Sequence, residues 1–202
     1  MKFIVIDGNI GCGKTTLLNQ LKNKLDAFIV LESVEEWKKD GILDKYYQNP
    51  KEMAFIFQMK VAISHLKNIK NLIEKHGQNI TIISERSTYS CFNIFTKMLE
   101  KVNFMNEDEV RIHRELCLDC GIKPDIYLYL KTDVDVALER IKKRNRETNI
   151  SRDYLEDLNN QYENLREICE EDGIGFFEID ANVIKEEVLK NSLNTIINFY
   201  NN

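Results

Sequence analysis

The sequence predicts a doubly wound α/β domain, in which one five-stranded parallel sheet carries helices on both faces. Short apolar runs of strand length recur along the chain, and each is followed by a helical stretch. These runs occupy residues 3–6, 27–31, 80–83, 126–130 and 176–179. The runs at 80–83 and 126–130 are apolar enough to be covered on both faces, which is typical of parallel sheets. Because no linker rich in proline and glycine interrupts the pattern, we expect a single domain over residues 1–202.

The first run leads directly into a glycine-rich turn that is typical of phosphate binding. A helical pattern of leucines follows the turn, whose residues are Gly8, Asn9, Ile10, Gly11, Cys12, Gly13, Lys14 and Thr15. The glycines let backbone N–H groups point at phosphate oxygens, and the helix begins there with its positive end. Lys14 can reach the outer phosphates, and Thr15 can bind Mg²⁺. The turn therefore indicates a protein that handles a nucleoside triphosphate.

Charged residues follow the second and third runs, at the sheet edge where ligands of such domains gather. Glu32 can act as a general base on an acceptor hydroxyl, although its position fits an ordinary acid at a helix N-terminus equally well. Glu85 can bind Mg²⁺, and Arg86 can hold a phosphoryl oxygen or orient the attacking hydroxyl. A charged pair that ends a buried strand at this edge favours a functional role over a surface ion pair.

A long helical pattern runs from about residue 50 to residue 75 and contains one conspicuous amide. Gln58 can make a two-point hydrogen bond to the edge of a nucleobase, or it can simply bond to the backbone. Trp37 and Phe57 can stack on a base or belong to the core. Tyr47 can bind a sugar hydroxyl or cover a hydrophobic cluster.

Two further amphipathic helices are predicted at residues 106–120 and 151–171, and a cationic stretch precedes the second. Arg140 and Arg144 lie four residues apart and share a helix face, and Arg146 follows them. Such a cluster can clamp a triphosphate, although solvated basic helix ends are common. The polar run after it is typical of a lid loop.

Composition is ordinary for a globular protein, and we expect a cytoplasmic location by default. The net charge of −5 argues against a dedicated nucleic-acid partner, and no apolar run approaches membrane-spanning length. The five cysteines are odd in number and irregularly spaced, which argues against a disulfide framework. The first strand starts almost at the N-terminus, so we expect no targeting peptide.

Taken together, these stretches resemble the deoxynucleoside kinase family, in the family's order and over nearly the whole chain. The likeness is carried by the phosphate loop, Glu32 to Trp37, Tyr47 with Phe57-Gln58, the Glu85-Arg86-Ser87 triplet and the arginine stretch. The resemblance implies a P-loop kinase fold with an arginine-rich lid. It also implies transfer of the γ-phosphoryl group of ATP to the 5′-hydroxyl of a deoxyribonucleoside, with Mg²⁺, for nucleotide salvage. Family members are typically homodimers, here through the helices at 50–75 and 106–120.

The resemblance further implies roles for individual residues. Glu32 would take the proton of the 5′-hydroxyl, Arg86 would hold that hydroxyl, and Glu85 would serve Mg²⁺ together with Thr15. The nucleotide would be held by Gly8 to Thr15, with Thr16 beside them. The other implied contacts are Gln58 and Trp37 with the base, Tyr47 and Glu147 with the sugar 3′-hydroxyl, and Arg140, Arg144 and Arg146 with the triphosphate.

The chain departs from the purine- and cytosine-preferring members of that family at two positions. Those members carry an arginine after the Phe-Gln helix and an aspartate after the Glu-Arg-Ser signature, where this chain has His65 and Cys91. The small, uncharged Cys91 leaves room for the thymine methyl group. The expected acceptor is therefore a pyrimidine deoxynucleoside, with a tilt toward thymidine.

Two other functions remain open. A nucleoside monophosphate kinase of the thymidylate type shares the loop and the arginine lid, but the acceptor phosphate then needs extra cations, whereas Glu32 favours an uncharged acceptor. A nucleotide-dependent switch would carry the loop without an acceptor site, and Gln58, Tyr47 and Glu32 argue against that.

Overall fold

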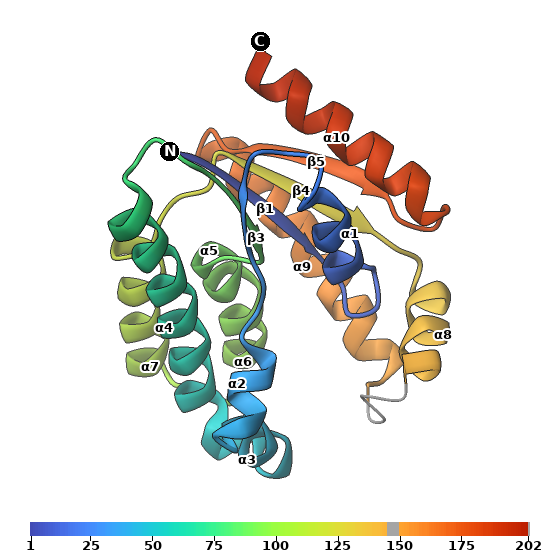
Figure 1. Cartoon of the computed structure of the whole chain (residues 1–202). Coiled ribbons are helices and arrows are strands. Elements are labelled where there is room, and N and C mark those ends of the chain that lie inside the picture. The colour runs from blue at the N-terminus through green and yellow to red at the C-terminus, as the bar shows by residue number, and fades with distance from the viewer. Residues whose placement is uncertain (145–149, 202) are drawn as a thin grey trace.

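The computed structural model describes residues 1–144 and 150–201 and contains a five-stranded, all-parallel sheet (Figure 1). The strands lie in the order β2-β3-β1-β4-β5. Their bounds are Lys2–Gly8 for β1, Phe28–Val30 for β2, Thr81–Glu85 for β3, Ile126–Lys131 for β4 and Gly175–Asp180 for β5. Each apolar run of the sequence forms one strand, so the predicted sheet is confirmed.

Helices pack on both faces of this sheet, as predicted. The first helices are α1 (Lys14–Leu21), α2 (Val34–Lys39), α3 (Ile42–Gln48), α4 (Pro50–His76) and α5 (Thr88–Ser90). The π-helical segment η1 (Cys91–Thr96), α6 (Lys97–Lys101), α7 (Glu107–Arg114) and the π-helical segment η2 (Glu115–Asp119) follow. The last three are α8 (Val134–Arg144), α9 (Arg152–Glu171) and α10 (Lys185–Asn201). Within the described residues, no helix is both long and apolar enough to cross a lipid bilayer.

The alternation of side chains along β1 divides the core into two clusters. Phe3 and Val5 pack on the face covered by α9, whereas Ile4 and Ile6 pack on the face covered by α1 and α10. All four side chains are buried, which explains why the run has no polar positions.

The predicted helix boundaries agree with the capping groups. Asn106 accepts a hydrogen bond from the N–H of Glu109, and Ser151 accepts one from the N–H of Tyr154. Gly77 ends α4. The predicted helix at 106–120 differs in one respect: it is α-helical only as far as Arg114 and continues as a π-helix.

Parallel pairing brings the carboxyl ends of the strands to one edge of the sheet. Ile6 in β1 pairs with Glu85 in β3, so the chain that follows each of them emerges side by side. The glycine-rich loop after β1, the segment after β2 and the end of β3 therefore share this edge, where ligands of such sheets bind.

Candidate active site

The loop between β1 and α1 depends on its glycines. Gly11 and Gly13 have φ angles of 83° and 106°, which lie in the region that residues with a side chain rarely adopt. A Cβ atom on Gly11 would lie 2.8 Å from the carbonyl oxygen of Ala137 in α8, whereas one on Gly13 would meet no atom within 4 Å. The loop therefore turns tightly against α8 at Gly11, and the N–H groups of Ile10 and Cys12 donate within the loop to Asn9.

Lys14, the first residue of α1, is buried within the loop. Its ammonium group donates hydrogen bonds of 2.9 Å to the carbonyls of Gly8 and Asn9. The positive charge thus lies at the centre of the turn, where the helix N-terminus adds its own partial charge. This is the arrangement that phosphate binding requires.

The outer side of the loop is held by α9. The amide of Asn9 donates to the carbonyl of Leu155 at 2.8 Å and to Oδ1 of Asn159 at 2.9 Å. The hydroxyl of Tyr162 donates to Oδ1 of Asp7 at 2.6 Å. Two consecutive turns of α9 therefore fix the start of the loop.

The next functional pair joins the segments after β2 and β3. Nη1 of Arg86 lies 2.9 and 3.0 Å from the two carboxylate oxygens of Glu32. Nε of Arg86 lies 3.4 Å from Oδ1 of Asp7, and the guanidinium carbon lies 4.7 Å from the centre of the Phe95 ring. The guanidinium group therefore lies between two carboxylates and one aromatic face, next to the phosphate loop.

The backbone of Arg86 has an unusual conformation. Its φ angle is 61°, whereas its N–H still donates to the carbonyl of Ile6 at 3.1 Å. Ser87, the next residue, caps α5 by accepting from the N–H of Ser90. The chain thus turns sharply at the strand end, and a strained residue at such a point is typical of functional sites.

Glu32 remains ionised in this surrounding. Burial alone would raise the pKa of Glu32, but the positive charges of Arg86 and Lys14 outweigh burial and hold this pKa below its usual value. The site therefore contains a largely buried carboxylate that carries its negative charge at neutral pH.

Glu85 and Thr15 form an oxygen pair beside the loop. The hydroxyl of Thr15 lies 3.1 and 3.3 Å from the two oxygens of Glu85. Burial raises the pKa of Glu85, and the charge of Glu32 adds to this effect against the opposing influence of Lys14. A carboxylate and a hydroxyl that face each other beside a phosphate loop fit Mg²⁺, which takes few protein ligands together with phosphates and water. In the described residues, no cluster of three or more His, Cys, Asp or Glu side chains offers another metal site.

The predicted base-binding residues gather on α4 and α2. Gln58 is 5% exposed, and its Oε1 has no hydrogen-bond partner among the described residues. Trp37 packs edge-on against Phe57 at 5.6 Å between ring centres, and its indole N–H donates to Oγ of Ser64 at 3.1 Å. The two aromatic rings therefore pack against each other between α2 and α4. Tyr47, by contrast, is 59% exposed on α3.

His65 and Cys91, which the sequence analysis singled out for base preference, are both buried and neutral. Burial lowers the pKa of His65, although the charge of Glu32 partly offsets this, and Nε2 of His65 has no partner among the described residues. Burial raises the pKa of Cys91, and Cys117 adds to this effect, so Cys91 is a thiol. Two unpartnered polar atoms, on Gln58 and His65, therefore accompany an uncharged Cys91.

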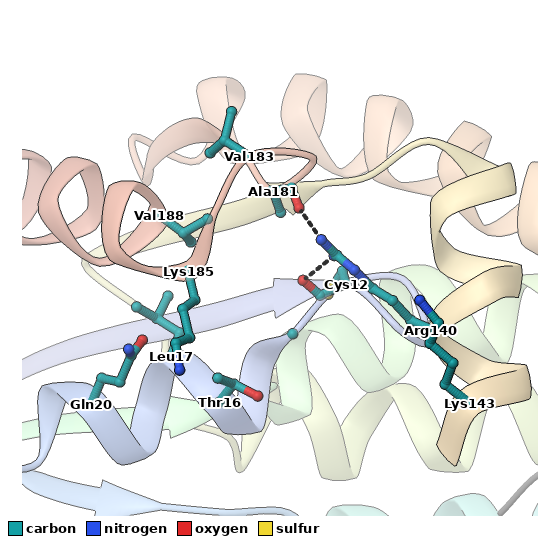
Figure 2. A pocket seen from close by; sticks show the side chains of 11 residues that line it. Cys12, Thr16, Leu17, Gln20, Arg140, Lys143, Ala181, Val183, Lys185 and Val188 are labelled. Carbon is teal, nitrogen blue, oxygen red and sulfur yellow. Dashed lines mark hydrogen bonds between the residues drawn. The ribbon is translucent and has the colours of Figure 1, made fainter. Parts of the chain in front are cut away.

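A second part of the edge contains a pocket of about 330 Å³ (Figure 2). Arg140 of α8 donates to the carbonyl of Cys12 at 3.4 Å and to that of Ala181 at 2.9 Å, and so joins the loop to the segment after β5. Val183 and Val188 form an apolar side of the pocket. The side chain of Arg144, and all of Arg146 and Glu147, lie outside the described residues.

The structure thus brings together the predicted loop with Glu32, Glu85 and Arg86. The sequence reading missed the contacts that hold them: Tyr162 and Asn159 on α9, Phe95 in η1, and the wall formed by Ala181 and Val183. The position of Ala181 directly after the fifth strand was a usable signal, because all strand ends meet at this edge. No feature of the sequence indicated that Tyr162, Asn159 or Phe95 would contact the site.

Comparison with known proteins agrees with this geometry. The family model described as deoxynucleoside kinase matches residues 4–200. The "Probable deoxycytidine kinase FPV151" of Fowlpox virus is 31% identical over 215 aligned positions, which cover 98% of this chain and 90% of that protein. The deoxyadenosine/deoxycytidine kinase of Bacillus subtilis is 29% identical over 168 positions, covering 80% and 75% of the two chains.

Among solved structures, the deoxyadenosine kinase of M. mycoides with the products dCMP and dCDP bound superposes with a TM-score of 0.81. The two chains are 26% identical, and the match covers 97% of this chain and 99% of the other. The family match, the shared fold and the buried carboxylate–arginine pair at the phosphate loop lead to one conclusion: the chain belongs to the deoxynucleoside kinase family.

Proposed function

We propose that the protein transfers the γ-phosphoryl group of ATP to the 5′-hydroxyl of a deoxyribonucleoside. The observation that carries this proposal is the contact of Glu32 with Arg86, because it places an ionised carboxylate beside the phosphate loop. A carboxylate there would repel an acceptor that already bears a phosphate, but it suits a neutral alcohol. The alternative of a nucleoside monophosphate kinase is therefore less well supported.

The side chains divide the chemistry as follows. Glu32 accepts the proton of the 5′-hydroxyl while that oxygen forms a bond to the γ-phosphorus and the bond to the bridging oxygen of ADP breaks. Arg86 orients the hydroxyl and neutralises charge on the transferred group, and Lys14 neutralises the outer phosphates of the donor. Thr15 and Glu85 would hold Mg²⁺, which would supply positive charge against that of the phosphates.

The donor base fits the pocket of about 330 Å³ beside the loop. Its apolar side, formed by Val183 and Val188, is suited to a flat aromatic base, and the planar guanidinium of Arg140 can lie against that base. The main-chain groups of this segment can then recognise the base edge. This supports ATP as the donor.

For the acceptor we propose a pyrimidine deoxynucleoside, with thymidine accepted as well as deoxycytidine. Gln58 has a free carbonyl oxygen and can turn its amide to suit either pyrimidine. The small thiol of Cys91 leaves room for a methyl group and needs no positive partner, and His65 is neutral. Tyr47 and Glu147 are the proposed ligands of the sugar 3′-hydroxyl.

We further propose that the protein is a homodimer that serves nucleotide salvage in the cytoplasm. Ile56 and Ile63 lie seven residues apart on α4 and are 50% and 49% exposed, and Ile112 on α7 is 41% exposed. Helices α4 and α7 lie side by side, so these residues can form one apolar surface for a second copy (Figure 1). All five cysteines are free thiols, which suits a reducing compartment.

A phosphorylation panel with Mg²⁺ and ATP tests the activity. Thymidine, deoxycytidine, deoxyadenosine, deoxyguanosine and thymidylate are each offered as the acceptor, and the 5′-phosphorylated product is identified. We expect product with the two pyrimidine nucleosides and none with thymidylate. Phosphorylation of thymidylate alone would show a monophosphate kinase, and nucleotide binding without any nucleoside product would show a switch.

The dimer is tested by light scattering coupled to size-exclusion chromatography. The wild type is expected at twice the mass of one chain, and the variant Ile56→Glu/Ile63→Glu at the mass of one chain. Exchange of the exposed Ile197 of α10 for Glu is the matched control and should leave the mass unchanged.

A further inference from the structure

We infer that His113 is a positioning residue for the acceptor base and acts through Gln58 and the π-helical segment η1. The inference rests on the proposed function, because it concerns how the base-reading amide is held. His113 lies on α7 and is completely buried. Within the described residues, it makes no hydrogen bond to the phosphate loop. His113 therefore supports the residues proposed to bind the acceptor base and not those proposed to bind ATP.

The hydrogen bonds of His113 fix its tautomer. Nε2 lies 3.1 Å from the main-chain carbonyl of Gln58, and a carbonyl only accepts, so the hydrogen sits on Nε2. Burial lowers the pKa of His113, which keeps the ring neutral. Nδ1 is then an acceptor and takes the hydroxyl proton of Thr96 at 2.7 Å.

Thr96 carries this contact into η1. Its hydroxyl oxygen also lies 3.1 Å from the carbonyl of Cys91, five residues earlier, which is the spacing of a π-helical turn. The single hydroxyl proton goes to the nearer acceptor, Nδ1 of His113. One imidazole ring therefore joins α4 at Gln58 to the segment that carries Cys91.

Packing alone does not explain a histidine at this place. The surrounding cluster is largely apolar and includes Phe57, Phe92 and Val110, while the sulfur of Cys117 lies 3.4 Å from Nε2 and 3.7 Å from Nδ1 of the ring. A buried imidazole costs free energy there unless both nitrogens are bonded, and here both are. A Leu or Met side chain would fill the space without that cost, so the hydrogen bonds account for the choice of residue.

The consequence for the acceptor follows from geometry. Under the proposed function, Gln58 of α4 and Cys91 of η1 would contact the same base, and their relative position would decide which base edge fits. A shift of one element by less than 1 Å weakens a two-point hydrogen bond considerably. The ring of His113 therefore sets the register between the two groups that distinguish one base from another.

Three variants test the inference. His113→Leu removes both hydrogen bonds, Thr96→Val removes one while keeping the shape, and His113→Gln retains a donor that can reach the carbonyl of Gln58. Val110→Ala is the matched control, because Val110 lies on the same helix and in the same apolar cluster but makes no polar contact with Gln58. For each variant, KM for the four deoxynucleosides, KM for ATP, kcat and Tm are measured.

We expect His113→Leu to raise KM for the preferred deoxynucleoside by about tenfold. The kcat/KM ratios among the four nucleosides should converge, while KM for ATP stays unchanged. Thr96→Val should give a smaller change in the same direction, and His113→Gln should recover most of the wild-type ratio. Val110→Ala should lower Tm but keep the ratios.

Two results would overturn the inference. One is a His113→Leu or Thr96→Val enzyme that loses Tm like Val110→Ala and keeps the wild-type nucleoside ratios. The other is a His113→Gln enzyme no better than His113→Leu. A wild type that phosphorylates none of the four nucleosides would instead overturn the proposed function, and the inference with it.

Discussion

Arg86 donates from one guanidinium nitrogen to both carboxylate oxygens of Glu32, at 2.9 and 3.0 Å. This contact joins two strand ends that lie 54 residues apart in the sequence. It also decides the protonation of the acceptor site, because the charge of Arg86 keeps Glu32 ionised against the effect of burial. The proposed base is thus active over the whole neutral pH range.

Replacing Glu32 by Gln should lower kcat by about 100-fold, because the amide cannot accept the proton of the 5′-hydroxyl. Binding of ATP, measured by calorimetry, should be retained, since the hydrogen bonds of Glu32 are to Arg86 and not to the phosphate loop within the described residues. Glu36→Gln is the control: Glu36 is an exposed carboxylate on α2 that pairs with Lys60, and its loss should leave kcat unchanged. Wild-type turnover in Glu32→Gln would refute the assignment.

The effect of pH on enzymatic activity should change with the Mg²⁺ concentration, because protons and Mg²⁺ compete for Glu85. Its pKa in the folded protein lies above the usual value of 4.5, so protons compete with Mg²⁺ at a higher pH than for an ordinary glutamate. Activity should therefore fall on the acid side at a pH above 4.5, and more Mg²⁺ should move this fall to lower pH. Rate profiles at two Mg²⁺ concentrations measure the shift, and coincident profiles would contradict it.

The same shift has a consequence for stability. Because the folded-state pKa of Glu85 exceeds the unfolded one, its ionisation opposes folding, and this loss of stability develops as pH rises through the folded pKa. Glu85→Gln should therefore raise Tm at neutral pH without Mg²⁺ and should abolish the rise in Tm that Mg²⁺ gives the wild type. Thermal unfolding with and without the ion provides the comparison.

Backbone strain at Arg86 can be measured with two variants that both lack the side chain. At a φ angle of 61°, Gly is unstrained whereas Ala is not, so Arg86→Gly should be more stable than Arg86→Ala by about 1 kcal/mol. Both should be inactive. Asn103, with a φ angle of 56° in an exposed turn, is the control: Asn103→Gly should leave activity intact. Equal stability of the two Arg86 variants would show that no strain is stored there.

Two loop glycines separate a steric effect from a conformational one. In Gly11→Ala, the new Cβ would lie 2.8 Å from the carbonyl oxygen of Ala137, and the residue would also have an unfavourable positive φ. In Gly13→Ala, the positive φ is the strain, because the new Cβ has open space among the described residues. Gly11→Ala should lower Tm further than Gly13→Ala, because α8 must move away from the loop. Its KM for ATP should rise as well. Thermal denaturation curves give the Tm of each variant, and initial rates at several ATP concentrations give its KM for ATP.

Base preference should respond to Cys91. Replacing it by Asp introduces a buried carboxylate where the thymine methyl group is expected, and so should lower kcat/KM for thymidine relative to deoxycytidine by about tenfold or more. Cys169→Ser, a change at a buried thiol of α9 away from the base, is the control and should keep the ratio. An unchanged ratio in Cys91→Asp would remove the argument for thymidine.

The sheet and the loop could be predicted from the sequence because their signals are local. Four or five apolar residues in a row identify a strand, and the glycine spacing identifies the turn after β1. The strand ends then share one edge by the geometry of parallel pairing, which is why Glu32, Glu85 and Arg86 could be placed together in advance.

The residues that hold the site in place could not be recognised from any short sequence pattern. Tyr162 and Asn159 look like ordinary positions of an amphipathic helix, and only the packing of α9 against the sheet brings them to the loop. Thr96, at the end of a π-helical segment, likewise makes a side-chain hydrogen bond to a histidine from another helix. These contacts arise from tertiary packing, which residue spacing along one element does not contain.

The hydrogen bonds between α9 and the phosphate loop have a consequence for synthesis of the chain. Asn9 and Asp7 are synthesised before their partners Asn159 and Tyr162, which follow 150 and 155 residues later. A nascent polypeptide that ends before α9 would contain every residue of the glycine-rich turn and still lack the groups that hold it in shape. We therefore expect that nucleotide is captured only after α9 has been synthesised and has packed against the sheet.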